Sequence, residues 1–480
     1  MSTAADGQPA EEQLSKEGAE SEYLCWFLHR HLDFRRQEVE AILGTASAPQ
    51  PRPVHWRQPY GDCEVSPFWY LHLQSEAEAL LLTERCMIPR GIYEIWGEGK
   101  DMVDLQQSIE ACSAQKLAAW CSADLTFKVA VDGWGQTLTQ EQQVELIEQL
   151  AFLPIQGRVK LKHPDVIFHL IVARWQENTG LPEVPHRLYF GREVAVSNRN
   201  ATIKRYALSS RRYLGPTSMD TEMAFIMCNQ AQVRKGMLVW DPFVGTGSIL
   251  VAAAHLGAQT FGTDIDIRVI KWGKKDPAGR PVDIWSNFKD YGLKPPAGLV
   301  RADAHGLPFR SNLHNIFGAI VCDPPYGVRA GGTKLEAKPR TNHLDPVDHI
   351  PSTAPYALSE CLWDLLDTAA RLLIPGARLV YFLPSIPHLY QETILPTHPA
   401  LKMVANSEQI LTQRYSRRLI TMQKVAEYDS AAAKAHLDLI QPSLRLHDEI
   451  ASSVWQPRQE EQAGNSTTNV EKRRYRSKLV

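Results

Sequence analysis

Short apolar runs alternate with helical segments between residues 237 and 385, and this order constrains the fold more than any other feature. Segments 248–257 and 356–373 carry helical periodicity. Apolar runs typical of buried strands occupy 237–240, 258–266, 298–304, 316–327 and 377–384. Such alternation builds parallel βαβ units. We therefore expect an α/β domain with a doubly wound, Rossmann-like sheet that binds its ligand at the carboxyl ends of its strands.

The remaining sequence divides around this domain. A chain of 480 residues is too long for one ordinary domain, so two or three are expected. Residues 1–20 are acidic, lack apolar periodicity and should be disordered. The expected parts that follow are an α+β domain over 21–176, a proline-containing linker over 177–187, the α/β domain over 188–430, and a C-terminal helix with a disordered basic tail over 431–480.

The α+β region shows mixed periodicity. Its pattern predicts a helix within 23–44 after a short apolar start, a strand over 66–73, a helix over 76–86 and a strand over 126–135. Aromatic and basic residues occur close together here. Large aromatic side chains are more often core than surface, so we assign Trp26, Trp69 and Trp96 to the buried core.

Composition restricts the class of protein and the compartment. The formal net charge of −2 gives no global positive field, although a local basic patch can still bind nucleic acid. No apolar run is long enough to predict a membrane span, and the N-terminus resembles neither a secretory signal nor a transit peptide. The eight cysteines lack metal-ligand spacing, so we predict no metal and reduced thiols in a cytoplasmic protein.

A glycine-containing turn joins the first predicted strand of the α/β domain to its first helix. Glycines let the backbone pass close to a ligand, and a helix N-terminus offers free N–H groups, although such turns also occur without a ligand. Position 250 is leucine where a dinucleotide fingerprint needs glycine or alanine, so a nicotinamide site is disfavoured. The residues of interest are Asp241, Phe243, Gly245, Thr246 and Gly247.

Acidic residues end the next two predicted strands. Asp264 and Ile265 follow the second strand, and Asp303 and Ala304 follow the third. A carboxylate at the second strand can accept hydrogen bonds from ribose hydroxyls, and Asp303 with Ala304 can bind an adenine amino group. The alternative for each acid is a helix N-cap. Together, after consecutive strands, they outline a pocket for adenosine.

The fourth predicted strand runs into the sequence CDPPYGV, Cys322 to Val328. Two prolines lack N–H groups and fix φ near −65°, so they form a stiff turn that holds Asp323 and Tyr326 in place. A rigid structural loop is the alternative. The position at the end of a strand favours a reactive-site turn, with Cys322 as a small residue that ends the buried strand.

These motifs resemble a known family. The turn DPPY with DPFVGTG resembles amino-methyltransferases that use S-adenosylmethionine and methylate exocyclic amines of bases. RRYLGPTSMD, FGTDID and SRRLITM are similar to the catalytic subunit of tRNA (guanosine-10 N2)-methyltransferase. HLDFRRQEVEAIL, SPFWYL and YEIWGEG resemble the RNA-binding half of that family, which contains a THUMP domain. The resemblance covers roughly residues 23–430.

The resemblance implies roles for individual residues. Asp323 and the Pro324 carbonyl would each accept one N–H of the target amine, and Tyr326 would stack on the flipped base. Implied substrate contacts are Pro325, Gly327 and Arg329. Implied contacts with S-adenosylmethionine are Thr217, Ser218, Asp241, Phe243, Gly245, Thr246, Gly247, Asp264, Ile265, Asp303 and Ala304. The chain has Pro216 where the family has asparagine, and no role follows for Arg417 and Arg418.

The family also implies partners. They are tRNA and a small zinc-binding activator subunit that adds a strand at an exposed sheet edge. Two other functions remain open at this point. One is an amino-methyltransferase for another tRNA guanosine or for DNA adenine, and the other is a tRNA-binding protein without turnover. The residues alone decide neither the modified nucleotide nor whether one or two methyl groups are added.

Overall fold

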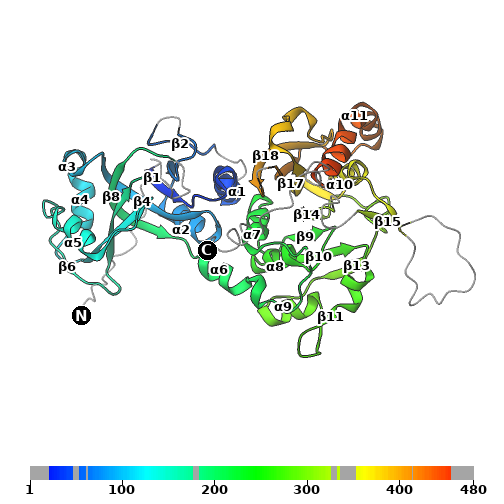
Figure 1. Cartoon of the computed structure of the whole chain (residues 1–480), viewed down its shortest axis with the longest axis horizontal. Helices are drawn as coiled ribbons and strands as arrows, with labels where there is room; N and C mark the ends of the chain where they lie inside the picture. Colours follow the sequence, from blue (N-terminus) through cyan, green and yellow to red (C-terminus); the bar gives the residue numbers. More distant parts are fainter. Residues whose placement is uncertain are drawn as a thin grey trace, which may run out of the picture.

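The computed structural model describes residues 21–46, 53–60, 63–176, 183–325, 332–335, 353–412 and 414–455. Two large sheets lie side by side along the long axis of the molecule (Figure 1). We term residues 21–196, which form the first sheet and its helices, the N-terminal lobe. Residues 199–455, around the second sheet, are the C-terminal lobe. Residues 1–20 and the basic tail, which were expected to be disordered, lie outside the described residues. The helix that was expected before the tail is described.

The first sheet has the strand order β2-β3-β1-β4-β8-β7-β5-β6. Strands β7, β5 and β6 run parallel, and the remaining neighbours are antiparallel. The tryptophans assigned to the core are confirmed, since Trp26, Trp69 and Trp96 are all buried. The strands are β1 (Ser21–Phe27), β2 (Trp56–Arg57), β3 (Phe68–Leu73), β4 (Pro89–Gly99), β5 (Thr126–Trp134), β6 (Arg158–Val159), β7 (Val166–Ala173) and β8 (Arg187–Val196).

Helices cover the first sheet in two groups. The helices α1 and α2 pack on one face through residues such as Val39 and Leu82, and α3 buries Leu105 and Ile109 against β4 and β8. Thr139 begins α5 with a capping box, a reciprocal pair of hydrogen bonds with Gln142. The helices are η1 (Leu32–Phe34), α1 (Arg35–Ala46), α2 (Glu76–Arg85), α3 (Met102–Glu110), α4 (Ala114–Trp120) and α5 (Gln140–Glu148).

The second sheet has the order β13-β10-β9-β14-β17-β19-β18. The strands from β13 to β17 are parallel, whereas β19 and β18 are antiparallel additions. Strand order reverses between β9 and β14, the position where doubly wound sheets open a crevice for ligands. The strands are β9 (Leu238–Asp241), β10 (Gln259–Asp264), β13 (Gly298–Arg301), β14 (Phe317–Cys322), β17 (Leu373–Ser385), β18 (Leu401–Ile410) and β19 (Ser416–Lys424).

Alternate residues of the second sheet enter two different cores, which explains the double winding. Val321 and Phe382 face α7, α8 and α9, whereas Ile320 and Tyr381 face α10 and α11. Cys322 ends β14 fully buried, as predicted. The helices are α6 (Arg199–Tyr206), η2 (Leu208–Ser210), α7 (Thr221–Gln230), α8 (Ser248–His255), η3 (Arg268–Trp272), α9 (Ile284–Tyr291), α10 (Leu358–Leu372), η4 (Pro387–Leu389), η5 (Glu392–Ile394) and α11 (Ser430–Trp455). Two small ribbons complete the lobe: β11 (Lys274–Lys275) with β12 (Pro281–Val282), and β15 (Thr333–Leu335) with β16 (Thr353–Pro355).

Two expectations need correction. Strand β8 follows the predicted linker but lies between β4 and β7, so the N-terminal lobe extends past the expected boundary at residue 188. The reason is that β8 finds its hydrogen-bonding partners in strands far away in the sequence. The helix expected within 23–44 follows the apolar start, as predicted, and that start forms β1, but α1 runs two residues past the predicted stop at Gly44, to Ala46.

The two lobes share a hydrophobic core. Val39 and Ile42 of α1 belong to the same buried cluster as Phe225 and Ile226 of α7, and the two helices are in contact. A polar contact crosses the same interface. Arg30 of the N-terminal lobe donates to the buried Glu222 of the C-terminal lobe at 3.0 Å, and Arg199 of the C-terminal lobe donates to the same carboxylate at 2.6 Å.

Candidate active site

The turn after β9 is stabilised by a buried carboxylate. Asp241 ends β9, and its Oδ1 accepts the N–H of Phe243 at 3.0 Å. Gly245 (φ +47°) and Gly247 (φ +80°) both adopt left-handed backbone conformations, and α8 begins at Ser248. A Cβ on Gly247 would lie 2.9 Å from Ile284 Cγ2, whereas a Cβ on Gly245 would meet, among the described residues, only Phe243 O, at 3.9 Å. Gly245 therefore borders open space in which a ligand can pass close to the backbone.

Asp264 connects the end of β10 to this turn. Its Oδ2 accepts the N–H of Gly245 at 3.0 Å, and its Oδ1 accepts the N–H of Asp266 at 2.9 Å. The helix η3 begins only at Arg268, so Asp264 is not its N-cap. Each carboxylate oxygen has a second lone pair with which it can accept a further hydrogen bond.

Asp303 likewise follows its strand without capping a helix. It is buried, two residues beyond β13, and its Oδ1 accepts the N–H of His305 at 3.0 Å in a turn. Ala304 follows it, half-buried, and Ile265 is half-buried after Asp264. The N-cap alternative therefore fails for both acids.

Three carboxylates gather at the ends of neighbouring strands. Burial raises the pKa of Asp241 far above its usual range, and the charges of Asp264 and Asp323 raise it further. Burial also raises the pKa of Asp264. Carboxyl groups that share a site disfavour one another's ionised forms, whereas a positive group of a bound ligand would favour them.

The predicted reactive turn lies at the end of β14, beside β9. Pro324 is buried there and Pro325 is half-buried. Asp323 Oδ2 accepts a hydrogen bond from Arg417 Nη1 at 3.1 Å, across from β19. The remaining predicted residues of the turn, Tyr326, Gly327 and Arg329, lie outside the described residues.

A loop before α7 contacts the glycine turn. The hydroxyl groups of Ser218 and Thr246 are 2.7 Å apart, and Ser218 Oγ also accepts the N–H of Gly215. Thr217 and Pro216 are exposed in the same loop, where the proline fits a turn. The loop therefore borders the turn after β9, as its assignment to the same site requires.

Sequence reasoning missed two side chains of this region. Thr263 Oγ1 donates to Pro242 O and accepts from Trp240 Nε1, both at 3.2 Å, so it fixes the β9 turn from the neighbouring strand. Arg417 was given no role, although it contacts Asp323. Its only sequence signal is the pair Arg417-Arg418 at the start of a predicted strand, which does not reveal which face each side chain occupies.

The described residues contain no helix with the length and apolar character needed to span a bilayer. Nor do they bring three histidine, cysteine or acidic side chains together in a way that could bind a metal ion. The eight cysteines are free thiols.

Comparison with known proteins defines the class. Residues 21–199 match a family model described as the Tmrp11 THUMP N-terminal domain, and residues 209–338 match one described as RMKL-like, methyltransferase domain. The chain thus combines a THUMP-type N-terminal region with a Rossmann-like methyltransferase domain, which confirms the predicted fold class. Among solved structures, TrmN from Thermus thermophilus is 18% identical with a TM-score of 0.40, over 84% of this chain and 100% of that chain.

Similar proteins define the family. The tRNA (guanine(10)-N(2))-methyltransferase TRMT11 of Mus musculus is 36% identical over 430 residues, which cover 88% of this chain and 92% of that protein. The Homo sapiens protein is 36% identical, with 86% and 90% covered. The Dictyostelium discoideum protein is 34% identical, with 89% and 86% covered. The chain belongs to the tRNA (guanine(10)-N(2))-methyltransferase TRMT11 family.

Proposed function

We propose that the chain transfers a methyl group from S-adenosylmethionine to the exocyclic N2 amine of guanosine 10 in tRNA. The observation that carries this proposal is the placement of the Asp323-Pro324-Pro325 turn beside the acid-lined glycine turn, at the point where strand order reverses. Membership of the TRMT11 family supports the choice of guanosine 10, because its members are named for that position.

The residues of the site fit S-adenosylmethionine. Its sulfonium and ammonium groups are positive, and the carboxyl groups of Asp241 and Asp264 lie at the turn, where a bound cation would favour their ionised forms. The open space at Gly245 lets the ligand approach the backbone. We assign Asp264 and Ile265 to the ribose, Asp303 and Ala304 to the adenine, and the remainder of the molecule to Thr217, Ser218, Asp241, Phe243, Gly245, Thr246 and Gly247. When bound, S-adenosylmethionine supplies an electrophilic methyl group whose carbon–sulfur electron pair stays on the sulfur.

The stiff turn positions the exocyclic amine of guanine, which is a weak nucleophile. The amine lone pair of guanine is delocalised into the ring, so the nitrogen attacks poorly. Asp323 and the Pro324 carbonyl each accept one N–H, which directs the lone pair toward the methyl group. As the new nitrogen–carbon bond forms, the nitrogen loses one proton to the Asp323 carboxylate, and positioning supplies much of the acceleration. The prolines keep both acceptors in place before the base arrives.

The remaining turn residues would hold the base. We assign stacking on the flipped guanine to Tyr326, and further substrate contacts to Pro325, Gly327 and Arg329. Stacking of a base on an aromatic ring contributes about 1–3 kcal/mol. That energy offsets part of the cost of taking the base out of its helix.

We assign tRNA binding largely to the N-terminal lobe. Arg158, Lys160 and Lys162 are exposed on the edge strand β6 and the residues after it. Such cations contact phosphates without reading sequence, so this part of the affinity should fall steeply with salt. The lobe would then bring the target nucleotide to the C-terminal lobe.

We also assign the family's small zinc-binding activator to a sheet edge. The second sheet ends at β18 and β13. The edge at β18 contacts the N-terminal lobe, since Asp33 accepts the N–H of Glu408. Exposed Trp272 and Val300 lie at the edge formed by β13, which makes it the better site for strand addition.

We also assign the protein to the cytoplasm, because free thiols fit that location.

Labelled methyl transfer to an unmodified tRNA transcript, followed by nucleotide mapping, tests the function. The full chain purified with the activator should label guanosine 10, and a transcript with adenosine at that position should stay unlabelled. Label at another guanosine, or on DNA adenine, would replace the proposal with one of the alternatives.

A further inference from the structure

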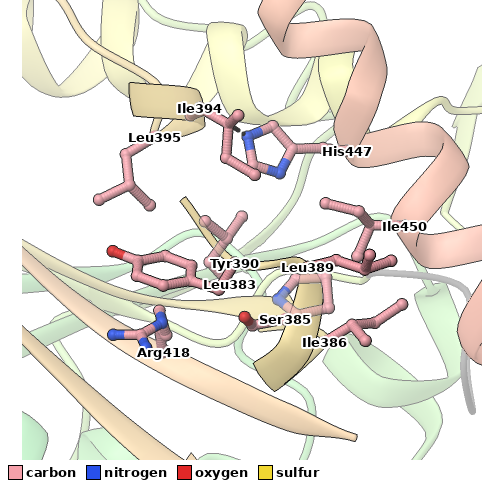
Figure 2. Close-up of a pocket in the computed structure, with 11 residues that line it drawn as sticks. Leu383, Ser385, Ile386, Leu389, Tyr390, Ile394, Leu395, Arg418, His447 and Ile450 are labelled. Atoms are coloured by element: carbon pink, nitrogen blue, oxygen red, sulfur yellow. Dashed lines mark hydrogen bonds between the residues drawn. The ribbon is translucent and has the colours of Figure 1, made fainter. Parts of the chain in front are cut away.

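Two consecutive arginines of β19 have different environments. Side chains on a strand alternate between its faces, so Arg417 and Arg418 point to opposite sides of the second sheet. Figure 2 shows Arg418 beside Tyr390, in a small cavity at the carboxyl end of β17. Its Cζ lies 3.3 Å from the centre of the Tyr390 ring, and its Nη1 donates to Asn406. Arg418 therefore belongs to packing on the face of α10 and α11.

Arg417 faces the candidate active site. Its Cζ lies 3.7 Å from the centre of the Phe382 ring, and its Nε donates to Gln409 Oε1 at 2.6 Å. Nη2 lies 3.7 Å from the sulfur of Met219, in the loop that contains Thr217 and Ser218. Nη1 donates to Asp323 Oδ2 at 3.1 Å. Within the described part of the chain, these contacts with four different segments hold the guanidinium in one orientation.

We infer that Arg417 is a positioning residue that orients the Asp323 carboxylate as an acceptor for the target amine. An arginine guanidinium stays charged at any working pH, and its planar fork fixes the direction of the hydrogen bonds that it donates. Only 12% of the Arg417 side chain and 25% of the Asp323 side chain are exposed, so water screens the pair less than it would at the surface.

The geometry explains why such a residue is needed. Asp323 lies close enough to the buried Asp241 for each carboxyl group to disfavour ionisation of the other. A neighbouring cation favours the ionised form of Asp323 and offsets this mutual influence. Without Arg417, the Asp323 side chain would gain rotational freedom, and small misplacements at a reacting centre reduce rates strongly.

This inference rests on the proposed function, and one set of assays distinguishes the two. Transfer to tRNA is first measured with the wild-type chain, then with R417A, R417K and R418K. R417A should lower kcat by more than about tenfold, while cofactor affinity, measured by calorimetry, stays unchanged. R417K keeps the positive charge but lacks the planar guanidinium, so its kcat should lie between those of R417A and the wild type. R418K is the matched control and should keep wild-type kcat.

A double-mutant cycle isolates the contact. If Arg417 acts through Asp323, adding R417A to the D323N variant should cause no further loss in kcat. Wild-type kcat in R417A, equal losses in R417K and R418K, or additive losses in the cycle would each overturn the inference. Absence of transfer by the wild-type chain would instead overturn the proposed function, and the inference with it.

Discussion

Glu38 on α1 accepts a hydrogen bond from Asn229 Nδ2 on α7 at 2.8 Å, so a fully buried carboxylate joins the two lobes. Its other contacts are the N–H groups of Met87 and Ile88. Burial is the main influence, and it raises the pKa of Glu38 to about 7. We therefore expect the joint between the lobes to be sensitive to pH.

The first prediction follows from the sign of that shift. Because the pKa is higher in the folded chain, protonated Glu38 stabilises the fold below about pH 4.5, and this stabilisation disappears as pH rises through about 7. Because Glu38 loses its proton in this range, the free energy of unfolding should fall by about 1 kcal/mol between pH 6 and pH 8. Denaturant titrations of wild type and E38Q at both pH values measure it, with exposed Glu148→Gln as the control. A wild-type minus E38Q difference that does not change with pH would contradict the prediction.

The second prediction concerns catalysis. D323A should lower kcat to below about a tenth of wild type, a loss of more than about 1.4 kcal/mol, because the amine loses an acceptor. The fold and cofactor affinity should remain, since Asp323 follows β14 rather than lying inside it. Single-turnover methyl transfer and calorimetry measure both quantities. D438A, at an exposed position of α11, is the control. Near-normal kcat in D323A would remove this residue from its proposed role.

The third prediction compares two glycines of one turn. G245A should weaken S-adenosylmethionine binding more than it destabilises the fold, because its Cβ would enter open space on the ligand side. G247A should mainly destabilise, since its Cβ would collide with Ile284. Each carries the strain of a left-handed backbone, about 1–2 kcal/mol. Thermal unfolding and calorimetry separate the two effects, and an identical pattern in both variants would place the ligand elsewhere.

The local sequence predicted much of the C-terminal lobe. Strands β9, β10, β13 and β14 were predicted from short apolar runs, and the residues of β9 and β14 enter both cores of the lobe. Parallel strands end at one edge of a sheet, so Asp241, Asp264 and Asp323 had to converge. The topology of the sheet follows from such local signals, and part of the site follows from the topology.

Long-range pairing could not be predicted in the same way. Strand β8 lies beyond a proline-containing segment, and its neighbours β4 and β7 are chosen by hydrogen bonds across the first sheet. Arg417 and Asp323 are 94 residues apart, and only the register of β19 on β17 brings them together. The apolar run that opens β1 fits a strand or a buried helix equally well from its residues.

The fourth prediction concerns the core that the lobes share. Because α1 and α7 belong to one buried cluster, the full chain should unfold in one calorimetric transition. I42A, in α1, should lower that transition as a whole, at a cost of about 2–5 kcal/mol. The control variant L439A, at an exposed position of α11, should change the free energy of unfolding by less than about 0.5 kcal/mol. Two separate transitions, with only one shifted by I42A, would show that the lobes fold independently.

The last prediction concerns the partner. If the activator adds a strand at β13, apolar side chains exposed at that edge should contact it. Trp272 is 45% exposed and Val300 is 37% exposed, whereas Ile410, 71% exposed, lies at the end of β18. W272S and V300S should therefore reduce the soluble yield of the co-expressed pair and the amount of activator that co-purifies, while I410S should not. An uncovered sheet edge promotes aggregation, so the chain expressed alone should be poorly soluble. A soluble, fully active chain without the activator would show that no partner is needed. Loss of the activator in I410S alone would move the contact to the opposite edge of the sheet.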